Sequence, residues 1–232
     1  LDRSPISKGL VARINKEYKR FIAELKRKNA EESIDASEVK KLLDNSSYQD
    51  KIVYLWQIAH GLRISEALGI RWQDVDLENS TVTIKQQIQK INLKEAVGTK
   101  YENQSDQVIL KSDSGIRTLD LEKQTQEWLE SVPVEQRIGL VYKTANGDSC
   151  DHRNWRRNHF NKLVKKLGLN IKYTHTLRKF WSSYLAQSNV NPMLISKGMG
   201  HKDMQTTLKN YVKPILQMQR LDTSSITQLI RG

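Results

Sequence analysis

The chain has 232 residues, a length that fits one large domain or one domain with an appendage. Its mean hydropathy is −0.64 and it contains no run of about 18 apolar residues, so we expect a soluble protein without a membrane span. The single cysteine, Cys150, excludes an internal disulfide and fits a reducing compartment. The first residue is Leu1 rather than methionine, so we expect a fragment of a longer protein.

Positive charge is concentrated in one part of the chain. The whole sequence holds 38 Lys and Arg against 26 Asp and Glu, a net charge of +12 with an isoelectric point near 9.7. Residues 151–220 contain 14 of the basic residues and only 2 of the acidic ones, so this segment alone carries the whole excess. One-signed charge at this density predicts a polyanionic partner, most often nucleic acid, with a membrane surface as the weaker alternative.

The N-terminal part predicts one helix followed by a linker. Residues 8–30 place apolar side chains at helical spacing, and a linker is expected at about 29–34. Asp35 and Glu38 then form the pattern of a capping box, which predicts the start of another helix. We therefore expect the main domain to begin near Ile34.

Most of the remaining chain also predicts helices. Residues 49–60 are apolar enough for a buried helix, which Gly61 ends, and Ser65 begins another. From Glu122 onward the apolar spacing predicts helices over residues 122–132, 153–167, 174–188, 191–199 and 203–211.

Strand signals are confined to the middle of the chain. Residues 81–88 alternate as a strand does, and residues 107–121 predict two strands around a turn at 112–115. The polar stretch 89–106 between them is expected to form a long loop. The predicted fold is therefore mainly α with a small antiparallel β-sheet, in the α+β class.

Several common kinds of site are excluded. The sequence lacks the GxxxxGK[ST] loop of a nucleotide phosphate site, the GxGxxG turn of a dinucleotide site, and GxSxG. The basic segment holds too few carboxylates for the paired metal ions of a nuclease. Cys150, His152 and His159 lack the paired spacing of a structural zinc site, so we expect no metal there. Chemistry on a phosphodiester would therefore depend on cationic side chains.

Three motifs carry side chains suited to a phosphate. Arg63 stands where a helix begins, a place that disfavours positive charge unless an anion lies nearby, and Glu66 one turn on can brace it. His175 and Arg178 share a helix face, where a guanidinium can bond two phosphate oxygens and an imidazole can exchange protons. Lys111 lies at the head of the turn between two strands. Taken singly, each motif is more typical of a solvated or structural side chain.

Taken together and in order, these motifs resemble the tyrosine recombinase, or phage integrase, family. GLRISEAL, the lysine before SDSGIRTL, HTLR, and GHKDMQTT followed by a tyrosine occur in the family's order. The stretch LWQIAHGLRISEALGIRWQDVDL is also similar to the family's two helices around its first arginine. The resemblance covers about residues 35–215 and implies an active site, supported by Glu66, that consists of Arg63, Lys111, His175, Arg178, His201 and Tyr211.

The resemblance implies a site-specific recombinase that cleaves and rejoins DNA without metal, ATP or any other cofactor. Tyr211 would attack the scissile phosphate, leaving a 3′-phosphotyrosine and a 5′-hydroxyl. The two arginines and His201 would hold the phosphate oxygens, His175 would assist proton transfer, and Lys111 would protonate the leaving oxygen.

The same resemblance implies partners and a domain plan. Residues 1–34 would lead from an upstream core-binding domain, residues 35–215 would form the catalytic domain, and the tail 216–232 would dock on a neighbouring protomer of a homo-tetramer on double-stranded DNA. Packing of the tail on its own domain is the alternative. An accessory directionality factor would be a further partner, and the expected location is at DNA in the cytoplasm of a prokaryotic cell. Candidate DNA contacts at a helix start are Arg153, Arg156 and Arg157.

Other interpretations stay open. A non-catalytic DNA-binding protein on the same fold would share the charge and the helices. A type IB topoisomerase or a telomere resolvase would share the chemistry and differ in its products. Lys100 is the alternative to Lys111 as the catalytic lysine, and it lies in a loop that is longer than in compact family members. Lys111 is chosen because it stands directly before SDSGIRTL.

Overall fold

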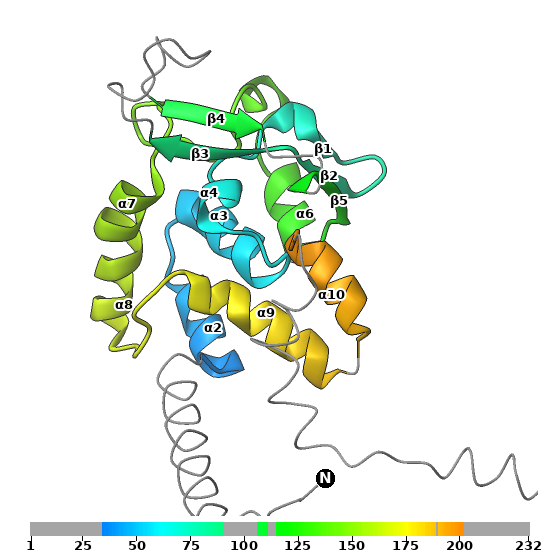
Figure 1. Cartoon of the computed structure of the whole chain (residues 1–232). Helices are drawn as coiled ribbons and strands as arrows, with labels where there is room; N and C mark the ends of the chain where they lie inside the picture. Colours follow the sequence, from blue (N-terminus) through cyan, green and yellow to red (C-terminus); the bar gives the residue numbers. More distant parts are fainter. Residues whose placement is uncertain (1–33, 91–105, 111–114, 189, 202–232) are drawn as a thin grey trace, which may run out of the picture.

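The computed structural model describes residues 34–90, 106–110, 115–188 and 190–201, which form a mainly helical fold with two small sheets. Helices and strands follow the chain order shown in Figure 1: α2 (Ala36–Asp44), α3 (Tyr48–Ile58), α4 (Ile64–Ala67), η1 (Trp72–Asp74), β1 (Val75–Asp76), β2 (Thr81–Ile84), β3 (Gln86–Lys90), β4 (Asp106–Leu110), β5 (Arg117–Asp120), α6 (Lys123–Glu130), η3 (Val134–Gln136), α7 (His152–Trp155), η4 (Arg156–Phe160), α8 (Asn161–Leu167), α9 (His175–Gln187) and α10 (Pro192–Met199).

Helix α2 begins where the capping-box pattern predicts it. The Asp35 carboxylate accepts the backbone N–H of Glu38 at 2.9 Å, and the Glu38 carboxylate accepts the backbone N–H of Asp35 at 3.2 Å. Ile34, just before the cap, is buried in the core. The helices predicted at 8–30 and 203–211 lie outside the described residues.

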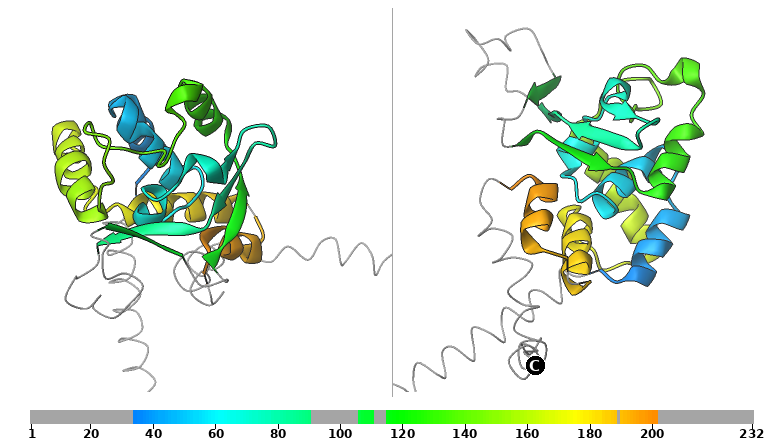
Figure 2. Two further views of the ribbon diagram at one scale, coloured as in Figure 1. Left: turned by 90° about the horizontal axis from the view of Figure 1, so that it is seen from above. Right: turned by 90° about the vertical axis from the view of Figure 1, so that its right-hand side faces the viewer.

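Helix α3 forms the centre of the hydrophobic core. All residues from Ile52 to Ile58 are buried, as the apolar run predicts. The helix contacts α2, α4, α6 and α9, which surround it in Figure 1. Helices α9 and α10 lie side by side and share a smaller apolar cluster (Figure 2). Among the described residues, no helix has both the length and the apolar character needed to cross a bilayer.

The strands pair differently from the sequence prediction. β2 pairs with β1 and β5, whereas β3 pairs with β4, all in antiparallel fashion. The two strands predicted within 107–121 are present as β4 and β5, but they do not pair with each other, so the predicted hairpin is wrong. Alternation of polar and apolar residues indicates which face a side chain occupies, but it does not identify the partner strand.

The strand predicted at 81–88 is divided at Lys85. Ile84 pairs with Arg117 in β5, whereas Gln86 pairs with Leu110 in β4. The partner strand therefore changes across Lys85, which separates β2 from β3. The loop predicted at 89–106 is also too long, because both of its ends belong to the paired strands β3 and β4.

The helix predicted at 153–167 is present with an irregular middle. α7 continues through η4, a π-helical segment, into α8. The wider π turn keeps Trp155 and Phe160, five residues apart, on the buried side, where both have no exposed surface. Arg153, Arg156 and Arg157 are exposed along the same helix.

Candidate active site

Glu66 lies at the centre of a set of charged side chains, here called the Glu66 cluster: Glu66, Arg63, Arg117 and Arg178. Its side chain has no exposed surface. The carboxylate lies 2.8 Å from Arg63, 2.8 Å from Arg117 and 3.8 Å from Arg178. A buried carboxylate requires such compensation, because removing a charge from water is costly.

The first arginine of the cluster is positioned by local structure. Arg63 caps the short helix α4 with an extended backbone, and its backbone N–H donates to Glu66 Oε2 at 3.0 Å. Its guanidinium donates to Glu66 Oε1 at 2.8 Å. The pairing that the sequence predicts between these residues is therefore present.

Arg178 joins three segments that are far apart in the sequence. It extends from α9, is only 5% exposed, and donates to the carbonyl oxygens of Gly61 at 2.7 Å and Met199 at 2.8 Å. The same guanidinium lies 3.0 Å from Nε2 of His201. These bonds fix the guanidinium plane between the segment before α4 and the end of α10.

Arg117 is a member of the cluster that the sequence analysis did not select. It is 7% exposed and donates to Glu66 Oε2 at 2.8 Å and to the Gly198 carbonyl at 2.6 Å. Burial, with a smaller contribution from Arg63, lowers its pKa to about 10, so it remains charged at neutral pH. The sequence did hold one signal for its burial. Arg117 stands two residues before Leu119, so both side chains lie on the inward face of β5.

His201 is held neutral by its surroundings. Burial and then the nearby Arg178, Arg63 and Arg117 lower its pKa to about 4. Because the Arg178 guanidinium can only donate, Nε2 of His201 accepts, and the neutral ring carries its proton on Nδ1. The imidazole can donate a hydrogen bond from that nitrogen.

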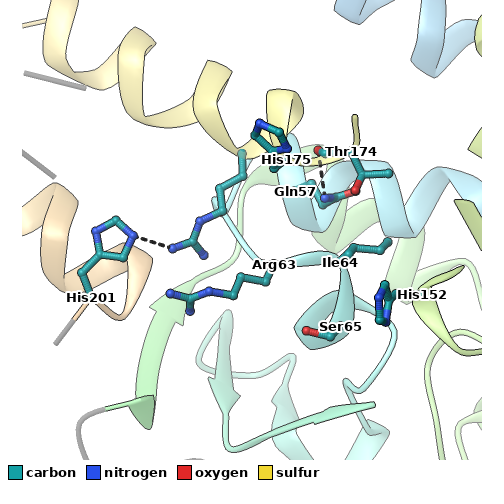
Figure 3. A pocket seen from close by; sticks show the side chains of 9 residues that line it. Gln57, Arg63, Ile64, Ser65, His152, Thr174, His175 and His201 are labelled. Atoms are coloured by element: carbon teal, nitrogen blue, oxygen red, sulfur yellow. Dashed lines mark hydrogen bonds between the residues drawn. The ribbon is translucent and has the colours of Figure 1, made fainter. Parts of the chain in front are cut away.

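A pocket of about 390 Å³ brings four of the predicted residues together. Arg63, His175, Arg178 and His201 all line it. In Figure 3 the Arg63 side chain extends toward His201, and His175 lies on the other side of the view, at the start of α9. Lys111 and Tyr211 lie outside the described residues, as do Lys100 and the tail 216–232.

The pocket has further polar residues that sequence analysis did not predict. They are Gln57, Ser65, His152 and Thr174. Gln57 is 1% exposed and its amide donates to the Thr174 carbonyl at 3.2 Å. Nothing in the sequence near Gln57 marks it, because its place in the pocket depends on how α3 packs against α9.

The electrostatics of the site favour an anion. Three guanidinium groups surround one carboxylate in the Glu66 cluster, which leaves an excess of positive charge beside the pocket. Fixed cations in a poorly hydrated site stabilise a developing negative charge strongly, because they need no reorganisation. The described residues contain no group of three His, Cys, Asp or Glu side chains suited to a metal ion.

One of the exposed arginines, Arg156, is linked to the pocket through an aromatic ring. The Arg156 guanidinium lies 5.4 Å from the centre of the Tyr173 ring, and that ring stacks on His175 at 5.4 Å between centres. Arg157 donates to the Asn154 side chain at 3.0 Å. A row of basic and aromatic side chains therefore leads from η4 to the pocket.

Comparison with known proteins identifies the class of protein to which this fold and site belong. Residues 32–217 match the model of the phage integrase family, so the chain belongs to this family of tyrosine recombinases. The integrase of Staphylococcus phage L54a is 29% identical over 182 residues, which cover 75% of this chain and 50% of the relative. A XerC-like tyrosine recombinase of Caldanaerobacter subterraneus subsp. tengcongensis is 23% identical over 200 residues, covering 79% of this chain and 51% of the relative.

The fold also has relatives among solved structures. The integrase of the Tn1549 transposon, in complex with a circular intermediate DNA, superposes with a TM-score of 0.65 at 17% identity. The match covers 86% of this chain and 65% of that one. The match to the two curated relatives described above is shorter, because the chain spans only about half of their length.

Proposed function

We propose that this chain is the catalytic domain of a site-specific DNA recombinase that acts through a covalent 3′-phosphotyrosine intermediate at Tyr211. The observation that carries the proposal is the Glu66 cluster, whose excess positive charge adjoins a pocket lined by His175 and His201. Membership in the phage integrase family supports the same chemistry.

In the proposed cleavage step, the Tyr211 hydroxyl oxygen attacks the scissile phosphorus and loses its proton. The bond from phosphorus to the 5′-oxygen breaks, and that oxygen leaves as a 5′-hydroxyl after gaining a proton from Lys111. A tyrosine with an ordinary pKa of about 10 needs help to ionise, which His175 and the adjacent cations would provide. Rejoining is the same exchange in reverse with a new 5′-hydroxyl, so bond energy is conserved and no ATP is consumed.

Arg63, Arg178 and His201 would stabilise the pentacoordinate transition state. Arg63 and Arg178 would donate to the non-bridging oxygens, and His201 would donate from Nδ1. The negative charge on these oxygens grows during attack, so donors that are already in place contribute more to the transition state than to the bound substrate. Side chains would supply this charge in place of a metal ion.

The assignment of Lys111 has support from its neighbours along the chain. Leu110 pairs with Gln86, and the Gln86 side chain donates to the Gly69 carbonyl at 2.6 Å, just beyond α4. On the other side, the Gly115 carbonyl accepts from Arg117 at 3.3 Å. Both described ends of the segment that contains Lys111 therefore adjoin the elements that carry the Glu66 cluster.

The proposed substrate is double-stranded DNA. Arg153, Arg156 and Arg157 would contact phosphates along the strand that enters the pocket. Exchange between two duplexes needs four active sites, so we propose a homo-tetramer on DNA, with the tail 216–232 docked on a neighbouring protomer and a directionality factor as an accessory partner.

The test uses supercoiled plasmid in EDTA with the 232-residue chain and its Tyr211→Phe variant. The expected result is an SDS-resistant protein–DNA adduct, or relaxed circles, with the wild-type chain and neither product with the variant. DNA binding without an adduct from either protein would contradict the proposal and favour a binding module on the same fold. Relaxed circles or closed hairpins without strand exchange on the element's own DNA would favour a topoisomerase or a telomere resolvase.

A further inference from the structure

Trp181 lies between two glycines that belong to different segments. It projects from α9, three residues after Arg178, and is half-buried. A Cβ atom added at Gly61 would lie 2.5 Å from Cε3 of the indole, and one added at Gly198 would lie 2.9 Å from Cη2. The indole therefore touches the backbone at both sites, at distances that only glycine permits.

The carbonyl groups of the same two glycines hold two arginines of the Glu66 cluster. Gly61 accepts from Arg178 at 2.7 Å, and Gly198 accepts from Arg117 at 2.6 Å. Gly61 also has φ of +63°, a conformation that other residues adopt only with strain. The backbone at both positions is thus shaped to accept the indole on one side and a guanidinium on the other.

Trp181 also packs against α10 through a small apolar cluster. With Leu185 and Val190 it packs against the buried residues Ala186, Ile195 and Met199. The Met199 carbonyl accepts the second nitrogen of Arg178 at 2.8 Å, and His201 follows two residues later. One aromatic ring is therefore in contact with the elements that carry three acceptors of the buried arginines.

We propose that Trp181 is a positioning residue, which sets the places of Arg178 and Arg117 by fixing the Gly61 and Gly198 carbonyls. The inference rests on the proposed function, in which Arg63, Arg178 and His201 bind the scissile phosphate. Trp181 touches no reacting atom in this scheme. A smaller ring leaves a gap into which the two backbone segments relax, and a misplacement of about 1 Å in a catalytic guanidinium can slow the chemical step about 100-fold.

The experiment compares Trp181→Phe with Gly198→Ala and with the double variant. Phenylalanine lacks the outer edge of the indole, so it makes room for the alanine Cβ that otherwise lies 2.9 Å from Cη2. Tyr184→Leu is the matched control, because it removes an aromatic ring that is 58% exposed on the same helix.

The first readout is the rate of adduct formation on supercoiled plasmid, alongside the affinity for a labelled duplex. Each single variant should form adduct about 10- to 100-fold more slowly, while DNA affinity stays within about threefold, because surface cations dominate binding. The double variant should form adduct about tenfold faster than Gly198→Ala alone, and Tyr184→Leu should match wild type. Rates that fall only in proportion to DNA affinity, or a double variant no faster than Gly198→Ala, would overturn the inference.

The second readout does not depend on activity. In protein labelled with ¹⁵N-arginine, the Nε–H of Arg117 should exchange with solvent at least about fivefold faster in Trp181→Phe than in wild type, because its bond to Gly198 is weakened. Unchanged exchange in Trp181→Phe would contradict the positioning role. If the wild-type chain binds DNA but forms no adduct, the proposed function fails, and the exchange rate alone still decides whether Trp181 positions Arg117.

Discussion

Two buried carboxylates, Asp50 and Glu66, are stabilised in opposite ways. Asp50, on α3, accepts from the Ser47 hydroxyl at 2.7 Å, the Trp155 indole at 3.0 Å and the His159 ring at 3.0 Å. Tyr142 adds a longer bond at 3.4 Å. We call this set the Asp50 cluster. Glu66 instead accepts from guanidinium groups.

The difference agrees with the roles that we propose, a structural site at Asp50 and a reactive one at Glu66. Donors of the Asp50 cluster come from Trp155 in α7 and His159 in η4, so this carboxylate ties the basic helix to α3. The donors to Asp50 are hydroxyl, indole and imidazole groups, and none of them is a guanidinium. The Glu66 cluster holds more positive charge than its carboxylate can balance, and such an excess is tolerated where an anion binds. Two carboxylates of similar burial thus indicate different roles through their partners.

The largest effect is expected from Glu66→Gln. The amide leaves three guanidinium groups without their counter-charge, so the free energy of unfolding should fall by about 3–5 kcal/mol. Sulfate should recover part of this loss, because an anion in the pocket replaces the missing charge. Urea denaturation with and without sulfate, at constant ionic strength, measures both effects. A variant as stable as wild type, or one that gains no more from sulfate than wild type does, would show that the cluster is balanced without Glu66.

Arg63→Lys should affect chemistry far more than folding. The Arg63 side chain is 40% exposed, so the stability change should stay within about 1 kcal/mol. A lysine lacks the planar fork that bonds two oxygens at once, and adduct formation should slow by about 100-fold. The rate on supercoiled plasmid and the unfolding midpoint are measured on the same preparations. A slower rate that is fully explained by a lower unfolding midpoint would assign Arg63 a structural role.

Asp50→Asn should show the reverse pattern. The asparagine keeps one oxygen acceptor but weakens the bonds to Trp155 and His159, so the free energy of unfolding should fall by about 1–3 kcal/mol. Sulfate should raise the free energy of unfolding of this variant no more than it does for wild type. Adduct formation should remain close to the wild-type rate. A sulfate response like that expected of Glu66→Gln would remove the distinction between the two clusters.

The smallest effect concerns pH. His201 titrates with a pKa of about 4 in the folded chain, below its ordinary 6.5, so between these values the unfolded chain binds the proton and the folded chain does not. Stability should therefore fall as the pH is lowered from about 6.5 to 4. The buried His60, whose pKa is also lowered to about 4, adds to the same trend. Between pH 7 and pH 5, the free energy of unfolding measured with urea should fall less for His201→Gln than for wild type. An equal fall would show that His201 does not contribute to the pH dependence.

What the sequence could predict was largely local. The capping box at Asp35 and the pairing of Arg63 with Glu66 involve residues three apart, so spacing alone identifies them. The four pocket residues Arg63, His175, Arg178 and His201 were found through their motifs, and the structure brings them together.

What the sequence could not predict depends on distant partners. Arg117 belongs to the cluster only because β5 pairs with β2 and faces α10, and neither fact is encoded near residue 117. The division of the strand at Lys85 likewise depends on a change of partner, because β2 pairs with β5 and β3 pairs with β4. Trp181 resembles an ordinary core residue until the two glycine contacts are known.

The most direct test of the central claim is to identify the residue that carries the DNA. After incubation with supercoiled plasmid in EDTA, the adduct is digested with nuclease and trypsin, and the modified peptide is sequenced by mass spectrometry. We predict a single nucleotide attached through its 3′-phosphate to Tyr211, and no such peptide from Tyr211→Phe. Attachment to another residue, or an adduct that persists in Tyr211→Phe, would contradict the proposal that the Glu66 cluster serves a tyrosine nucleophile at this position.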